Sequence, residues 1–382
     1  MSIDHVITSI DITTGGPARS VTHLIAAMLE VDNTLAIGLD TLKSDTPIIT
    51  SFNTPNSAVR FHDFEKLQRS KRLVASLSQS KINLFHGHAL WEMPVHQMAK
   101  IARKKKTPYI ITPRGMLEPW ALSQGKLKKQ LALKLFQYKD LEKASCLHAT
   151  APMEVESIRS LGLRNPVAMI PNGINLEEFS SEMPNKATHP KRILFLSRIH
   201  KKKGIENLIE AWQQLEPNVK QDWVIDIYGN GDETYINNLK TIIKKAQLED
   251  QIHIKAPVYG IVKAKLFRSA SIFVLPTFSE NFGVVVAEAL ASFTPVITTK
   301  GAPWEELETN NCGHWIDIGI ESLSKSLTNL MTQSPEVLLE MGVNGRRLIE
   351  QKYSMQAVAK QMLTLYDWIL NGSEKPDFID II

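Results

Sequence analysis

At 382 residues the chain is longer than one hydrophobic core usually supports, so we expect two domains. Hydrophobic residues make up 43% and charged residues 22%, which is typical of a folded globular protein and excludes a disordered or fibrous chain. The formal net charge is +4. The basic surplus lies in the first half, where Lys and Arg number 22 against 16 Asp and Glu in residues 1–180, compared with 22 against 24 in the remainder.

Targeting and membrane-spanning signals are not recognised in this sequence. Asp4 and His5 fall where the apolar core of a secretion signal should begin, and no run approaches the roughly 18 apolar residues of a bilayer span. Cys146 and Cys312 lie far apart and form no metal-type spacing. We therefore expect a reduced, cytoplasmic protein without structural zinc.

The chain opens with a predicted strand at residues 5–10, a loop with Gly15 and Gly16, and a predicted helix at 19–29. This order is typical of a doubly wound α/β domain, in which such a loop lies at the carboxyl edge of the sheet, where ligands bind. The loop lacks the third glycine of the dinucleotide fingerprint. A ligand loop and a purely structural turn both remain open.

Strands and helices continue to alternate, which predicts a mainly parallel sheet covered on both faces. His86 and His88 stand at the end of one predicted strand, and Arg114 follows another. A His-x-His pair can bind metal, but no further ligands stand at metal-site spacing. The alternatives are hydrogen bonding or charge stabilisation of a ligand, and histidines with structural partners. The further predicted strands are 34–39, 82–86, 109–112, 146–149 and 167–170, and the helices are 94–104, 126–143 and 153–161.

Residues 126–143 alternate lysines with leucines at helical spacing. This pattern predicts an amphipathic helix, which is either solvated or lies on an anionic membrane surface. No aromatic-basic module accompanies the charges, so we do not expect a nucleic-acid partner.

The polar, proline-bearing stretch 180–190 predicts a linker, which gives domains at 1–180 and 181–382. The second half alternates like the first, and its long final helix, 355–371, is a candidate to pack back toward the first domain. The tail after Gly372 looks loose. The predicted strands are 193–196, 223–228, 252–254, 272–275 and 296–298, and the helices between them are 205–215, 234–246 and 261–268.

Residues 275–290 form a strand, a tight turn and a helix start, with Glu280 and Glu288 on either side of Gly283. Helix starts of this kind offer free N–H groups to phosphate, and flanking carboxylates suit the hydroxyls of a sugar nucleotide. Another predicted strand leads into Arg198 and Lys203, which suit a diphosphate. Gly229 ends a third strand at the same predicted sheet edge, so three loops could converge on one ligand.

Taken together, these motifs resemble the donor site of glycosyltransferase family 4, retaining enzymes with the GT-B architecture. The match lies in the order and spacing of the motifs, and it covers nearly the whole chain. Four loops, at 15–20, 88–91, 113–117 and 301–304, resemble a bacterial subgroup that builds cell-surface polysaccharides. The motifs that carry the family resemblance are Arg198 and Lys203 before Gly204, Gly229-Asn230-Gly231, Glu280-Asn281-Phe282-Gly283 with Glu288, and Pro171-Asn172-Gly173-Ile174.

The resemblance implies an α/β fold of two doubly wound, Rossmann-like domains facing across a cleft. It implies that Arg198 and Lys203 neutralise the donor diphosphate, that Glu280 holds a sugar hydroxyl, and that Glu288 binds the ribose. Gly15 and Gly16 would let the first domain approach the diphosphate. The backbone that would contact sugar and phosphate belongs to Asn281, Phe282, Gly283 and Val284.

The family often places a histidine where this chain has Arg114, and either His88 or Arg114 could take over its role. The implied reaction moves a sugar from a UDP-sugar or GDP-sugar to a glycan or polyprenyl-diphosphate-linked acceptor. No Asp-x-Asp pair occurs in the chain, so we expect no metal and no other cofactor. Two alternatives are a sugar-nucleotide epimerase or hydrolase on the same scaffold, and a non-catalytic module that binds sugar nucleotides or anionic membranes.

Overall fold

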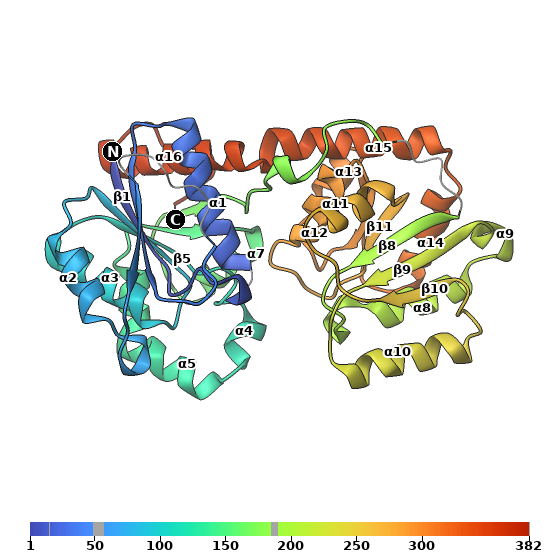
Figure 1. The fold of residues 1–382 in the computed structure, drawn as a ribbon, viewed down its shortest axis with the longest axis horizontal. Helices are drawn as coiled ribbons and strands as arrows, with labels where there is room; N and C mark the ends of the chain where they lie inside the picture. Colours follow the sequence, from blue (N-terminus) through green and yellow to red (C-terminus); the bar gives the residue numbers. More distant parts are fainter. Residues whose placement is uncertain (15, 49–56, 185–189, 382) are drawn as a thin grey trace. The chain divides into compact units, whose positions relative to one another are not determined.

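The structure is a computed structural model that describes residues 1–14, 16–48, 57–184 and 190–381. The chain forms two compact units, one made of Met1–Gly173 with Met355–Ile382 and the other of Ile174–Ser354 (Figure 1). This division differs from the boundary we expected at residue 180, because residues 174–180 pack with the second unit. The final helix belongs to the first unit. The predicted linker includes residues 185–189, which lie outside the described residues.

The first unit contains an eight-stranded sheet in the order β14-β7-β6-β5-β4-β1-β2-β3. All pairings are parallel except that of β14 with β7, so the predicted parallel sheet is confirmed. The strands are β1 Ser2–Val6, β2 Ala36–Leu42, β3 Ala58–His62, β4 Leu84–His88, β5 Tyr109–Thr112, β6 Cys146–Ala149, β7 Val167–Met169 and β14 Ile379–Asp380.

Helices cover both faces of this sheet. Successive strand residues point to opposite faces, so Ile110 packs with α1 and α16 while Ile111 packs with α2 and α3. The α-helices are α1 Gly16–Val31, α2 Lys71–Gln79, α3 Met93–Lys105, α4 Pro119–Ser123, α5 Lys126–Ala132, α6 Tyr138–Glu142, α7 Pro152–Ser160 and α16 Met355–Asn371.

The structure of this unit differs from the sequence predictions in several elements. The first strand ends at Val6 and not at residue 10, and beyond it Ile7 N–H still donates to the Asp40 carbonyl. Strand β3 and helix α2 were missed. The helix expected at 126–143 is divided into α5, a π-helical turn at Leu133–Gln137, and α6. The tail is not loose, because Ile379 and Asp380 pair with β7.

The second unit is a six-stranded parallel sheet in the order β10-β9-β8-β11-β12-β13. The strands are β8 Lys191–Leu196, β9 Trp223–Tyr228, β10 Ile252–Lys255, β11 Ile272–Leu275, β12 Val296–Thr299 and β13 Gly313–Ile316. The α-helices are α8 Ile205–Gln214, α9 Pro217–Lys220, α10 Glu233–Lys245, α11 Gly260–Ser269, α12 Val284–Ala291, α13 Glu306–Thr309, α14 Ile320–Met331 and α15 Pro335–Leu348.

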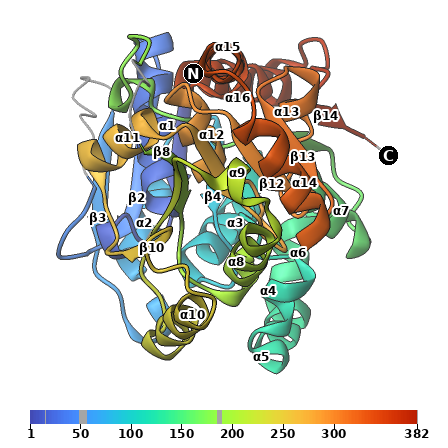
Figure 2. The same cartoon turned by 90° about the vertical axis from the view of Figure 1, so that its right-hand side faces the viewer.

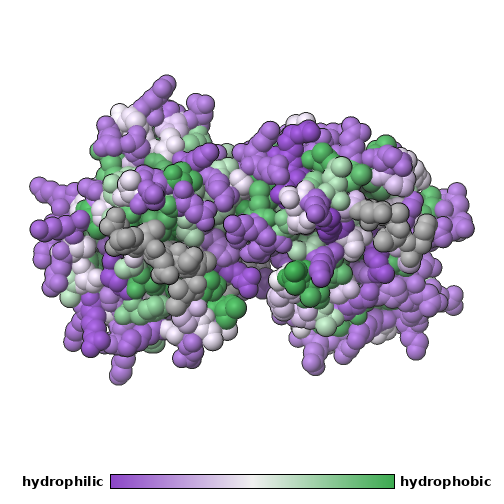
Figure 3. Space-filling model, turned by 45° about the horizontal axis from the view of Figure 1, so that its top comes forward, coloured by the Kyte–Doolittle hydropathy of each residue, from purple (hydrophilic) through white to green (hydrophobic). Residues whose placement is uncertain are grey.

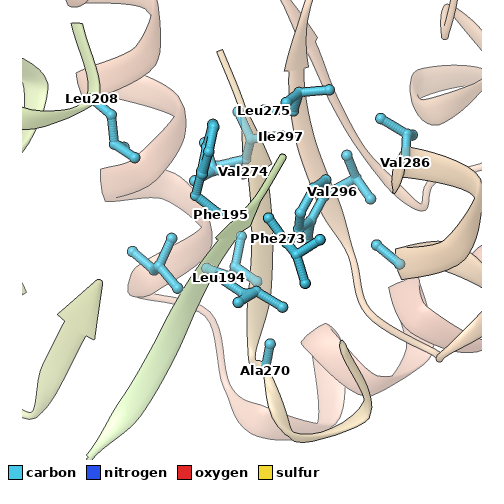
Figure 4. Packing of buried hydrophobic residues seen from close by; sticks show 14 of the residues in the cluster. Leu194, Phe195, Leu208, Ala270, Phe273, Val274, Leu275, Val286, Val296 and Ile297 are labelled. Carbon is cyan, nitrogen blue, oxygen red and sulfur yellow. The ribbon is translucent and has the colours of Figure 1, made fainter. Parts of the chain in front are cut away.

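The core of the second unit is built from these near-continuous apolar strands. Figure 4 shows Phe195 on β8 beside Val274 on β11, with Leu208 of α8 and Val286 of α12 on opposite sides of the strands. All four side chains are fully buried. This packing makes the strands a rigid base from which the loops at their carboxyl ends project.

The face of the molecule in Figure 3 is covered mainly by hydrophilic side chains, with smaller hydrophobic areas between them. Among the described helices, none is both long enough and apolar enough to cross a bilayer.

Candidate functional site

The predicted donor loops of the second unit leave one edge of its sheet. Strands β9, β8, β11 and β12 are parallel neighbours in that order, so the loops after them begin side by side. These loops carry Gly229, Lys203, Glu280 and Gly301 in the same order. The strand order reverses beside β8, which is where open α/β sheets bind their ligands.

Glycines allow these loops to pack backbone against backbone. Gly204 has a φ of +69°, and a side chain there would overlap the carbonyl oxygen of Pro276. A side chain at Gly229 would likewise overlap the Ser197 carbonyl. The Phe278 N–H donates to the Lys202 carbonyl at 2.8 Å, which ties the loop after β11 to the loop after β8.

Lys203 and Glu280 form an ion pair across these two loops. Their side chains are only 11% and 15% exposed, and the Thr277 hydroxyl donates to the same Glu280 carboxylate at 3.1 Å. The family resemblance implies that Lys203 contacts phosphate and Glu280 contacts the sugar. In the structure each charge is held by the other, so a ligand with phosphate and hydroxyl groups can exchange into a preformed pair.

Glu288 is paired in the same way. Its carboxylate lies 2.5 Å from the Lys263 ammonium, and the two side chains are 13% and 22% exposed. Sequence reasoning missed Lys263, which is one of two lysines on α11, because helical periodicity does not say which neighbour a surface lysine meets. The pair holds the carboxylate of Glu288 in place on α12, the helix that begins after Gly283.

Gly283 begins α12 in the left-handed conformation, with a φ of +77°. Phe282 beside it is 5% exposed and packs on Trp304 at 5.1 Å between ring centroids, so its side chain anchors the loop from inside. The Trp304 indole N–H donates to the Phe282 carbonyl at 2.6 Å. Sequence reasoning named the loop of Trp304 without assigning it this role. Val284 is 43% exposed at the start of the helix.

Arg198 lies at the same sheet edge and is exposed. It has no ion pair among the residues that the structure describes. The diphosphate contact predicted for its guanidinium stays a prediction.

In the first unit, the structure brings His88 and Arg114 together at the carboxyl ends of β4 and β5. The Arg114 guanidinium lies 3.3 Å from His88 Nδ1, and it also donates to Ser20 Oγ at 2.8 Å. Ala89, Trp91 and Arg114 all have positive φ angles, of 73°, 69° and 56°. Backbone strain of this kind concentrates where side chains must be held in place for function.

His88 belongs to a buried cluster of four histidines that sequence reasoning saw only in part. His5, His86, His88 and His148 are each no more than 3% exposed. Burial lowers the pKa of His5 to about 3 and that of His148 to about 4, and it holds the pKa values of His86 and His88 well below their usual range. All four rings are therefore neutral at pH 7.

Arg114 keeps its charge beside these rings. Burial lowers the pKa of the guanidinium to about 10, and the Glu154 carboxylate acts in the opposite direction. His5, His86 and His88 each offer a nitrogen within 4.8 Å of the others, which is close enough for three ligands of one metal ion.

Of the other predicted residues, Gly16 begins α1 and is exposed, and Gly15 lies outside the described residues.

Two families of known proteins match this chain. Residues 177–348 match the family described as Glycosyl transferases group 1, and residues 42–173 match the family described as Glycosyl transferase 4-like domain. The phosphatidyl-myo-inositol mannosyltransferase of Mycobacterium leprae is 29% identical over 216 residues, which are 54% of this chain and 54% of that protein. The chain spans about half the length of the curated relatives it matches.

Solved structures share the fold over nearly the whole chain. Sucrose-phosphate synthase from Thermosynechococcus elongatus matches with a TM-score of 0.73 and 18% identity, covering 98% of this chain and 100% of that one. HepE from Anabaena in complex with UDP-glucose matches with a TM-score of 0.67 and 16% identity, covering 96% and 99%. The predicted GT-B fold, with two Rossmann-like domains, is confirmed, and both units carry glycosyltransferase-type domains.

Proposed function

We propose that this protein is a retaining glycosyltransferase that moves a sugar from a nucleotide-diphosphate sugar to a hydroxyl group of a glycan or lipid-linked glycan. The observation that carries the proposal is the Lys203–Glu280 ion pair, held at the sheet edge beside the helix start at Gly283. HepE, which shares the fold, binds UDP-glucose, and this supports a nucleotide-sugar donor. The polysaccharide-type loops of the sequence favour a role in bacterial O-antigen, capsule or exopolysaccharide synthesis.

The main catalytic contribution is electrostatic. As the sugar leaves, negative charge grows on the diphosphate, and Arg198 and Lys203 stabilise that charge. A preorganised donor of this kind contributes about 3 kcal/mol, or roughly a hundredfold or more in rate. Glu280 then binds a sugar hydroxyl and Glu288 the ribose. Because the chain has no Asp-x-Asp pair, these cations replace the usual diphosphate-bound metal in this proposal.

Donor binding tests the proposal directly. A ligand that binds the folded state raises its thermal stability by mass action, so we would measure melting temperatures with UDP, GDP, ADP and their sugar conjugates. We expect one nucleoside diphosphate and its sugar to stabilise the protein and Lys203→Met to abolish the shift. If no nucleotide in the panel stabilises the wild type, the donor-site assignment is wrong.

Turnover separates the alternative functions. A transferase keeps its sugar nucleotide intact until an acceptor hydroxyl is added, whereas an epimerase or hydrolase consumes it alone. A binding module would show the thermal shift with no turnover for any glycan or polyprenyl-diphosphate-linked acceptor.

We also propose that α5 and the turn after it lie on an anionic membrane at the cytoplasmic face. Leu127, Leu131 and Leu135 are spaced four residues apart and are 82%, 58% and 71% exposed. Trp120 on α4 is 56% exposed, and α4 and α5 lie next to each other in the first unit (Figure 2). Leucines exposed in a row among lysines suit an interfacial helix better than a solvated one. This location suits an enzyme with a lipid-linked acceptor.

A further inference from the structure

A continuous line of hydrogen bonds runs through the buried histidine cluster of the first unit. Its seven bonds join residues from β1, β4, β5, β6 and α16, and the line ends on the backbone after β7. The successive distances are 3.3, 2.9, 3.4, 2.7, 2.7, 2.9 and 2.8 Å from Arg114 through His88, His5, Tyr366, His86, Thr112 and His148 to the Ile170 carbonyl.

The two ends of this line fix its direction. A guanidinium only donates, so His88 Nδ1 must accept from Arg114. A neutral imidazole has one donor and one acceptor, so His88 Nε2–H donates to His5 Nδ1. At the other end a carbonyl only accepts, so His148 Nε2–H donates to Ile170, and His148 Nδ1 accepts from the Thr112 hydroxyl.

The donor and acceptor roles assigned from the two ends of the line agree at Tyr366. Thr112 Oγ1 accepts from His86 Nε2–H, which leaves His86 Nδ1 to accept from the Tyr366 hydroxyl. The Tyr366 oxygen in turn accepts from His5 Nε2–H. Each of the four rings is therefore the Nε2-protonated tautomer, and none has a lone pair left for a metal ion.

All the hydrogen bonds of the line run in one direction, and this determines which atom His88 presents to Arg114. Along the line each group accepts a hydrogen bond on the side that leads to Arg114 and donates on the other side, so the bonds polarise one another in the same direction and His88 presents an accepting lone pair to the guanidinium. Within the described residues Arg114 has no ion pair, and its Nε is buried without a partner. Ser20 Oγ and Asn172 Oδ1, at 2.8 and 3.5 Å, accept from its Nη1. Among the described residues its hydrogen-bond partners are therefore neutral groups, so the guanidinium keeps its capacity to bind an anion.

We propose that this line is a one-directional relay that positions Arg114 for a substrate phosphate at the carboxyl edge of the first sheet. His88 is fully buried with both nitrogens bonded, so Arg114 is the group that contacts substrate and the histidines are positioning residues. The choice of phosphate as the anion rests on the proposed glycosyltransferase function. The tautomers do not depend on it.

Nitrogen-15 NMR of the histidine side chains tests the relay without any activity assay. At pH 7 we expect all four buried rings to show the neutral Nε2-protonated pattern, unchanged when Zn²⁺ is added. An Nδ1-protonated or doubly protonated ring among the four, or a Zn²⁺-dependent shift, would overturn the relay.

Tyr366→Phe removes the hydroxyl at the centre of the line and should alter the His5 and His86 signals. Tyr109→Phe is the matched control, because Tyr109 is 2% exposed in the same unit and its hydroxyl donates to the Asp140 carbonyl outside the relay. We expect the control to leave all four rings unchanged. Altered rings in both variants would mean that the signals report general loosening and would refute the relay.

Pyrophosphate tests the positioning role. Its binding should shift the His88 Nδ1 signal in the wild type, and that site should weaken about tenfold in Tyr366→Phe, the scale seen when partners of ligating groups are removed. Tyr109→Phe should retain the wild-type affinity. If pyrophosphate leaves His88 unchanged, or if both variants weaken equally, Arg114 is not positioned for phosphate. This readout is taken on His88 in the first unit, whereas the donor site is tested by the thermal shift and Lys203→Met, so the two proposals stand or fall separately.

Discussion

The buried histidines should make the first unit sensitive to mild acid. His5 and His148 have folded pKa values of about 3 and 4, against an ordinary value of 6.5. Between those values the unfolded chain binds a proton that the folded chain excludes, so the free energy of unfolding falls as the pH falls below 6.5. Each pH unit costs about 1.4 kcal/mol per ring. At pH 5 each of these two rings therefore destabilises the first unit by about 2 kcal/mol relative to neutral pH.

The variant His148→Gln isolates one ring. A glutamine amide still offers one donor to Ile170 and one acceptor to Thr112, but it does not titrate. Between pH 7 and pH 5 the variant should lose about 2 kcal/mol less unfolding free energy than the wild type. Other titrating groups contribute to both proteins and cancel in the difference.

Amide hydrogen exchange of peptides from β4 and β5, corrected for the intrinsic rates at each pH, measures this free energy for the first unit alone. Tyr109→Phe is the control, since it destabilises the same unit without removing a titrating ring and should keep the wild-type pH dependence. An equal loss of stability in His148→Gln and wild type would refute the conclusion that His148 is neutral and excluded from protonation.

Lys203→Met should lower kcat by about a hundredfold or more, because one preorganised cation is lost from the leaving diphosphate, and it should leave the far-ultraviolet circular dichroism unchanged; full transfer activity would contradict the site. Glu280→Gln should raise KM for the sugar nucleotide more than Kd for the free nucleoside diphosphate, and equal effects in kinetics and calorimetry would remove its sugar contact. Gly204→Ala should lower the melting temperature through the positive φ and the overlap with Pro276, and a wild-type melting temperature would show that the loops can separate. Leu131→Asp should abolish flotation with anionic vesicles, whereas flotation equal to wild type would exclude α5 as the contact.

The donor loops show which features of the candidate site can be predicted from the sequence. Lys203, Glu280 and Glu288 could be selected because loops after parallel strands share one sheet edge, and local order along the chain therefore predicts proximity. The residues with which they form ion pairs could not be selected in this way. Lys203 with Glu280 and Glu288 with Lys263 are pairings of side-chain ends, which depend on rotamers and loop conformations that periodicity does not contain.

The boundaries of strands and helices likewise divide into those that the local sequence predicts and those that depend on neighbouring elements. Hydrophobic runs bounded by turn residues gave β5, β9 and β11 with the ends that the structure has. Strand β3 was missed because it lies at the sheet edge with mostly half-buried or exposed residues, so its sequence lacks a clear apolar run. Strand β14 forms only because β7 offers it an edge, which no local pattern indicates.

By itself, the sequence determined two α/β halves, a set of phosphate-type loops and the residues that they carry, because strand periodicity and loop chemistry are local. Only the tertiary structure decided which charges form ion pairs and which rings belong to one line of hydrogen bonds. His5 and Tyr366 are 361 residues apart in sequence, yet both belong to one hydrogen-bond line that orients Arg114. Such a line depends on angles and distances between four strands, a helix and the backbone after β7, and these are set by core packing and not by any single segment.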